Sequence, residues 1–220
     1  MTSPTVAVRG TNSREVPPEI ADFTVTVQAR DKDRATTLNR LSERVATVRA
    51  TLDGYAAAIE KRETSRLSVY AERKRSGEKV AAYVGSATTT VTVTDLDAVG
   101  EMMLRVADQD QVMVNGPYWS VRPASPVYRE ARHAAIADAV TRAKEYAEAL
   151  GAQVTGLVEL TDSGMSATTP GRPMVARFAM AGGAAEQPEL NLDPQLQQIT
   201  AEIEARFTIS DPTVLAAPLD

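Results

Sequence analysis

The clearest alternation of hydrophobic and polar residues lies near the C-terminal end of the chain. From Ile199 to Ile209 every second residue is apolar, and threonine, glutamate or arginine stands between them. Successive side chains of a β-strand point to opposite faces, so this period of two predicts a strand with one buried and one wetted face. The stretch from Ala21 to Arg30 repeats the pattern. Both stretches are typical of antiparallel sheet that is covered on one side.

Residues 126–150 form the most clearly bounded helix. Ser125 can accept a backbone N–H as N-cap, Pro126 suits the first helical position, and Gly151 can take the left-handed conformation that ends many helices. Its apolar residues recur at spacings of three and four and are mostly alanine, so we expect it to lie close against a sheet. The predicted buried face contains Ala135, Ile136, Ala139, Val140, Ala143, Tyr146, Ala147 and Leu150.

Two shorter amphipathic helices precede this one. Asp31 or Asp33 caps the first, and Gly54 ends it. Thr94, with Asp97 three residues later, resembles a capping box for the second. The apolar stripes are Leu38, Leu41, Val45, Val48 and Leu52 in the first helix, and Leu96, Val99, Met103 and Val106 in the second.

The remaining pattern predicts mainly strands. A turn at residues 75–78 joins two of them into a hairpin that places Tyr70 opposite Tyr83. Gly116, between Asn115 and Pro117, predicts a bulge or bend in another. The element order is β-β-α-β-β-α-β-α-β-(β)-β, with the bracketed strand at residues 174–180, which predicts an α+β fold with helices on one face of antiparallel sheet. The strands other than the two alternating stretches lie at residues 5–9, 66–74, 79–94, 111–122 and 153–161.

Residues 1–209 then form one domain, or two sub-lobes of one, followed by a disordered tail at 210–220. Residues 162–194 are predicted to be a flexible loop, because they contain a Gly-Gly pair and several prolines. Long loops in compact domains tend to be functional or disordered, and methionines suit adaptable contact surfaces. Two interpretations stay open: plain disorder, or an arm that contacts a neighbouring subunit. The residues predicted for such self-assembly contacts are Met165, Met174, Phe178 and Met180.

Composition narrows the possible functions. The chain has 220 residues, a net charge of −5 and no cysteine, which excludes disulfides, thiolate nucleophiles and cysteine metal sites. The acidic balance argues against nucleic acid as a partner. No apolar run approaches the ~20 residues that a membrane-spanning helix needs, so we expect no integral membrane segment.

Candidate catalytic chemistry is sparse. His133 is the sole histidine and suits a helix surface, so a histidine metal cluster is excluded. The pairs Asp108 with Asp110 and Glu202 with Glu204 suggest acid–base chemistry, but both lie in contexts typical of solvated carboxylates. We therefore expect no catalytic residue, no cofactor and no metal.

A basic cluster lies at the predicted hairpin tip and consists of Arg73, Lys74, Arg75 and Lys79. One interpretation is a contact for an anionic ligand. The other is a solubilising tip that discourages pairing at the sheet edge. The aromatic residues expected of single-strand nucleic-acid binding are missing between these charges, which favours the second interpretation.

Several short motifs occur in an order that resembles the SIMPL-domain family. They are Val8-Arg9-Gly10, Pro18-Glu19-Ile20-Ala21, Ala82-Tyr83, Arg129-Glu130-Ala131 with Ala147 to Gly151 in the long helix, and Ala205-Arg206-Phe207. The resemblance covers nearly the whole chain, from about residue 5 to 209. It implies an α+β fold and, in some relatives, assembly into rings. It implies no established catalytic residue, cofactor or substrate.

These observations favour a non-enzymatic, self-assembling structural or interaction protein, and thus a homo-oligomer whose other protein partners are unknown. The alternative is a small-ligand binding or carrier protein that uses a cleft between the sheet and helix 126–150. Many SIMPL relatives are bacterial envelope or secreted proteins with a signal sequence. The residues from Met1 to Val6 have no such pattern, so we expect a cytoplasmic protein as written, or an envelope or secreted one if a leader was removed.

Overall fold

The computed structural model describes residues 3–73, 79–168 and 192–216 and divides the chain into two compact units. Of the described residues, unit 1 comprises 3–17, 122–168 and 196–216. Unit 2 comprises 18–73, 79–121 and 192–195. Each unit has its own antiparallel sheet with helices on one face, so the predicted α+β class is confirmed. The predicted element order is also observed, except that the bracketed strand lies outside the described residues.

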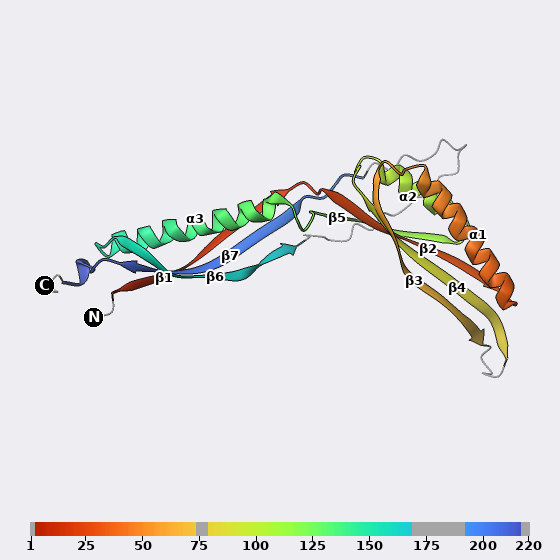
Figure 1. The fold of residues 1–220 in the computed structure, drawn as a ribbon, viewed down its shortest axis with the longest axis horizontal. Helices are drawn as coiled ribbons and strands as arrows, with labels where there is room; N and C mark the ends of the chain where they lie inside the picture. The colour runs from red at the N-terminus through yellow and green to blue at the C-terminus, as the bar shows by residue number, and fades with distance from the viewer. Residues whose placement is uncertain (1–2, 74–78, 169–191, 217–220) are drawn as a thin grey trace, which may run out of the picture. The chain divides into compact units, whose positions relative to one another are not determined.

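Unit 1 is a three-stranded sheet covered by one long helix (Figure 1). Its strands are β1 (Thr5–Val16), β6 (Val154–Thr168) and β7 (Gln197–Ile209), in the order β1-β7-β6. Strand β7 is the central strand, and its alternating residues are buried as predicted. Strand β6 continues to Thr168 rather than ending at Thr161, and a short 3-10 turn, η1 (Val214–Ala216), follows β7 within the stretch expected to be tail.

Helix α3 (Pro126–Ala149) begins and ends as the sequence predicts. Ser125 accepts a hydrogen bond from the backbone N–H of Val127, and Gly151 has a left-handed φ of 66°. The predicted buried face is wrong at Tyr146, which is 56% exposed. Alanine at every fourth position forms the contact row instead, because only the smallest side chains fit where the helix lies against the strands. This row consists of Ala131, Ala135, Ala139, Ala143 and Ala147.

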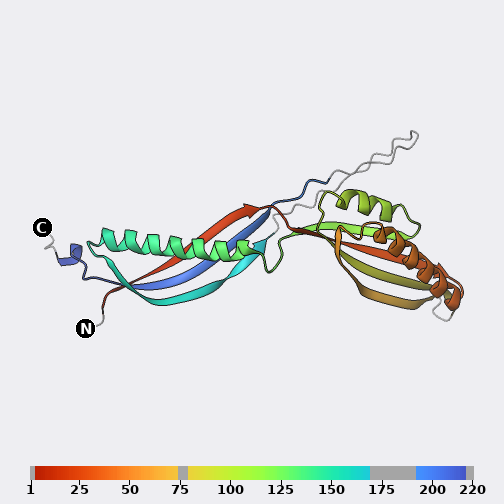
Figure 2. The ribbon, with the colours of Figure 1, turned by 45° about the horizontal axis from the view of Figure 1, so that its top comes forward.

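Unit 2 is a four-stranded antiparallel sheet with both of its helices on one face (Figure 2). The helices α1 (Arg34–Asp53) and α2 (Val99–Ala107) cover a core that includes Phe23, Leu52 and Met102. The strand order is β3-β4-β2-β5. The strands are β2 (Ile20–Asp31), β3 (Ile59–Arg73), β4 (Val80–Val93) and β5 (Val112–Ser120).

In unit 2, the cap predicted for α1 is observed, and the cap predicted for α2 is not. Asp33 caps α1 by accepting the Thr36 N–H at 2.8 Å, and this bond holds the pKa of Asp33 below its ordinary value. The predicted capping box at Thr94 is wrong. The Thr94 hydroxyl instead lies 3.2 Å from the Ala58 carbonyl oxygen, and α2 starts after Ala98 with no side-chain cap. This hydroxyl therefore bonds to the Ala58 carbonyl and caps no backbone N–H at the start of α2.

The hairpin of β3 and β4 has the predicted register at its tip and a different one beyond it. Arg73 lies opposite Val80, as a tight turn requires, but Tyr70 lies opposite Val84 rather than Tyr83. Ala81 is an additional residue on β4 between these pairs, and such a bulge shifts all later pairs by one. The bulge predicted around Gly116 is confirmed, because the β2–β5 pairing shifts between Asp22 and Thr24.

Candidate assembly surfaces

Helix α3 covers β1 and β7 and reaches over the outer edge of β1. The Asp138 carboxylate accepts the backbone N–H of Thr11 at 2.9 Å and lies 3.0 Å from Arg142. The Thr11 N–H, followed by Arg142, holds the pKa of Asp138 below its ordinary value. The β1 edge of the sheet is therefore covered by its own helix, and the Thr11 N–H is satisfied within the chain instead of facing a neighbouring chain.

The opposite edge of the same sheet, strand β6, presents apolar side chains to solvent. Leu157 is 58% exposed and Leu160 is 47% exposed. Their cross-strand partners on β7 are the buried residues Phe207 and Ala205, so both leucines lie on the helix-bearing face beyond the cover of α3. Val158 is an additional residue in the pairing and is also exposed. We call Leu157, Val158 and Leu160 the β6 strip.

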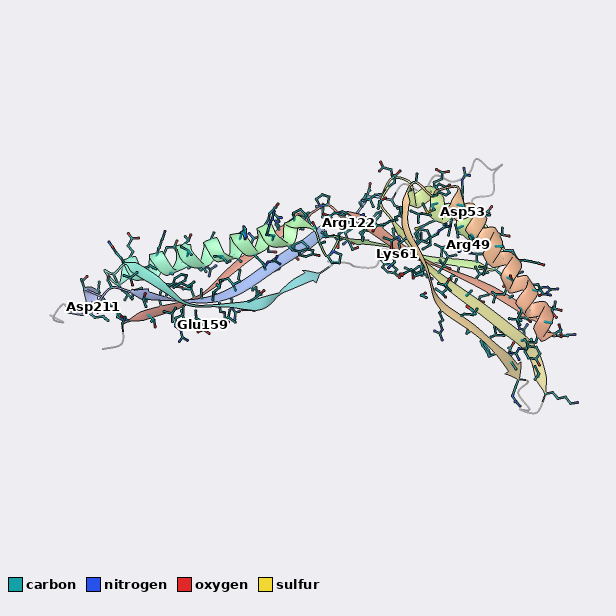
Figure 3. The ribbon with its side chains drawn as sticks, in the orientation of Figure 1. Arg49, Asp53, Lys61, Arg122, Glu159 and Asp211 are labelled. Atoms are coloured by element: carbon teal, nitrogen blue, oxygen red, sulfur yellow. The ribbon has the colours of Figure 1, made fainter. Side chains whose placement is uncertain are left out.

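The other face of this sheet is polar. Figure 3 shows Glu159 on the side of the sheet that faces away from α3. Nearby, Arg9 and Glu204 form an ion pair of 3.0 Å in which both side chains are more than half exposed. A wide, open hollow of about 410 Å³ lies over these residues. Exposed, paired charges of this kind suit a solvated surface rather than acid–base chemistry, which needs groups removed from water.

The sheet of unit 2 also has a long exposed edge strand, β3. Apart from Ile59, Ser68 and Val69, its residues are exposed, and Leu67 reaches 67%. Helix α1 contacts it near its start, where Arg62 lies 2.6 Å from Asp53. Figure 3 labels Asp53 and Arg49 on α1 and Lys61 on β3. Most of β3 thus extends beyond the contact with α1.

The family model for SIMPL, described as a protein of unknown function (DUF541), matches residues 6–207. The chain belongs to the SIMPL family. The match includes at least part of each of the seven strands and three α-helices that the structure describes. A comparison with curated proteins finds no similar sequence. The SIMPL assignment thus confirms the resemblance seen in the sequence and leaves the biochemical role open.

Most of the contacts predicted for self-assembly fall outside the described structure. Met174, Phe178 and Met180 lie outside the described residues. The backbone of Met165 is part of β6 and lies opposite Ala201. The methionine arm therefore stays a prediction.

Sequence reasoning missed the β6 strip, although the sequence contains a signal for it. Consecutive Leu157 and Val158 break the alternation of a strand that buries one face only. The sequence prediction also began β3 too late, at Arg66 rather than Ile59, because the charged residues between Glu60 and Arg66 have no strand-like alternation. An exposed edge strand has no buried face to impose that pattern on the sequence.

The other candidate residues of this SIMPL chain lie apart from one another. His133 is exposed on α3, Asp108 follows the end of α2, and Asp110 forms a 2.6 Å ion pair with Arg44. Arg73 and Lys79 are exposed beside the hairpin tip, whose Lys74 and Arg75 lie outside the described residues.

The described part of the chain also limits which metal sites and membrane-spanning helices it can contain. Within residues 3–73, 79–168 and 192–216, no cluster of three or more histidine or acidic side chains is arranged to hold a metal ion. No helix among those residues combines the length and apolarity needed to cross a bilayer.

Proposed function

We propose that this SIMPL protein is a non-enzymatic structural or interaction module that assembles with copies of itself through its sheet edges. The observation that carries the proposal is the exposed β6 strip, which lies on an edge strand of 15 residues. Edge strands present unpaired N–H and C=O groups that can recruit another chain, and apolar neighbours add surface to bury. The capped edge at β1 makes β6 the more accessible border of unit 1.

The β6 strip can be tested by replacing Leu157 and Leu160 with serine. Both side chains are about half exposed in the single chain, so the double variant should keep its fold while losing apolar contact area between copies. We expect at least a tenfold weaker assembly, measured by size-exclusion chromatography with light scattering. Circular dichroism checks the fold.

Leu215→Ser is the matched control, because Leu215 is also an exposed apolar residue of unit 1 but lies in η1. It should leave the assembly unchanged. A double Leu157→Ser, Leu160→Ser variant that assembles as well as the parent would contradict a role for the β6 strip.

A second candidate function, small-ligand binding, keeps some support from the same surface. The seam below α3 is tightly filled, since Ala135 and Ala139 have no exposed surface. The uncovered leucines of β6 lie at the border of that seam and suit an apolar ligand. An apolar dye that raises the melting temperature of the monomer, and does so less in the double serine variant, would favour this function over assembly.

A further inference from the structure

We propose that two copies of this protein pair through β3, antiparallel, in one register that places Leu67 of each copy on the two-fold axis. The inference deepens the proposed self-assembly and rests on it. It names a surface in unit 2, separate from the β6 strip, and the partner that this surface fits: a second copy of the same strand.

The pairing of β3 with β4 assigns each β3 side chain to a face of the sheet. Arg62, Thr64 and Leu67 lie opposite Val91, Thr89 and Ala87, on the face that carries the helices. The ion pair of Arg62 with Asp53 of α1 agrees with this assignment. Ser65 is the additional residue of a bulge, so it takes no position in the alternation.

The opposite, open face of β3 carries most of its charges. Lys61 and Glu63 lie on it and form an ion pair of 2.9 Å. Beyond the bulge, Arg66, Ser68, Tyr70 and Glu72 occupy the same face, opposite alternate residues of β4. Glu72 reaches Arg30 of β2 at 2.8 Å, which confirms its place on the open face.

With Leu67 on the axis and Ser65 of each copy left out of the alternation, no like charges lie opposite each other between residues 61 and 72, and opposite charges meet at both ends. On the open face, Lys61 meets Glu72 of the second copy and Glu63 meets its Tyr70. A two-fold axis repeats each contact, so both ends of the interface gain an opposite-charge pair. The neutral or mixed pairs between them are Arg62 with Ala71, Thr64 with Val69, and Arg66 with Ser68.

Neighbouring registers are less favourable. A slip that moves every pair by two positions brings Glu63 opposite Glu72 twice in one direction, and Arg66 opposite its own copy in the other. Like charges directly opposite each other destabilise a strand pair. A slip by one position exchanges the faces of all side chains. Larger slips leave residues at one end of each strand unpaired, so charge selects the register with Leu67 at the centre.

The exposed Leu67 provides the central contact. It is 67% exposed in the single chain, and in this register it lies against the same residue of the second copy. The bulges and charges of β3 discourage pairing with arbitrary strands, as is usual for edges. A strand with the complementary charge order avoids that penalty, and a copy of β3 has this order.

A cysteine at the axis tests the geometry directly. The protein has no cysteine, so Leu67→Cys adds a single thiol. Paired residues on antiparallel strands have Cα atoms ~4.5–5.5 Å apart, which is within the range of a disulfide. We expect mild oxidation of the full chain to crosslink this variant into a dimer at least tenfold faster than Tyr70→Cys, which lies away from the axis at similar exposure.

A charge exchange tests the register without relying on one variant. Lys61→Glu alone and Glu72→Lys alone place like charges at both ends of the interface, so each should pair at least tenfold more weakly than the parent. An equimolar mixture should restore pairing, because every end contact is again a glutamate against a lysine. The mixture contains the same changes within each chain, so its recovery reports contacts between copies.

The results of these experiments test the β3 pair separately from self-assembly in general. Preferential crosslinking at residue 67 together with recovery in the mixture supports the β3 pair. A parent that assembles, with equal crosslinking at residues 67 and 70 and no recovery, overturns the β3 pair and leaves self-assembly standing. A parent that is a monomer at every concentration overturns both.

Discussion

At the scale of single residues, Gly10 sets how closely α3 lies on the sheet of unit 1. A Cβ atom at this position would lie 2.0 Å from the carbonyl oxygen of Ala135 and 2.7 Å from the Cβ of Ala139. The first obstacle is main chain and cannot rotate away. Glycine on β1 and alanine on α3 thus act together to bring the two elements into contact.

Gly10→Ala should therefore destabilise the protein strongly. We expect the free energy of unfolding to fall by about 3 kcal/mol, the upper part of the usual range for overpacked sites. Urea unfolding measures it. Gly54→Ala is the control, since Gly54 has an ordinary φ of −63° and its nearest obstacle is at 3.2 Å. Equal stability of the Gly10→Ala variant and the parent would show that α3 does not lie this close to β1.

At the scale of elements, the bond between Asp138 and the Thr11 N–H joins α3 to the edge of β1 and should make stability depend on pH. The folded protein holds the pKa of Asp138 below its ordinary value of 3.8, so the unfolded chain binds a proton more readily. The stabilisation is present above that ordinary value and is lost as the pH falls through the lowered one.

Asp138→Asn should consequently show a shallower loss of stability between about pH 4 and pH 2 than the parent. Asparagine can still accept the Thr11 N–H, but it cannot be protonated in this range. Urea unfolding at several pH values provides the comparison. Glu145→Gln removes one charge from the same helix at an exposed site and serves as the control. Parallel pH profiles for the parent and Asp138→Asn would refute the stabilising role of this carboxylate.

Local chemistry explains which elements the sequence could predict. The ends of α3 follow from Ser125, Pro126 and Gly151, whose preferences act over a few residues. The register of the β3–β4 hairpin does not follow from such local preferences, because the bulge at Ala81 depends on how the two strands twist together. The exposure of Tyr146 likewise depends on which strands lie below α3.

At the scale of the whole molecule, the sequence indicates the α+β class but not the division of its strands into two sheets. Alternating residues show that a strand has a buried face, and they do not say which other strands share it. Edge strands such as β3 and β6 follow from that division. The sequence therefore could not show that β3 and β6 are edge strands, although Leu157-Val158 does mark the β6 strip, and the predicted contacts were placed at Met165, Met174, Phe178 and Met180 instead.

Self-assembly is the central claim, and the mass of the full chain in solution tests it most directly. We would measure that mass by size-exclusion chromatography with light scattering over a wide range of loading concentrations. The account predicts a defined assembly whose mass is a multiple of the 23.6 kDa chain and does not grow without limit. A mass of 23.6 kDa at every concentration would contradict it.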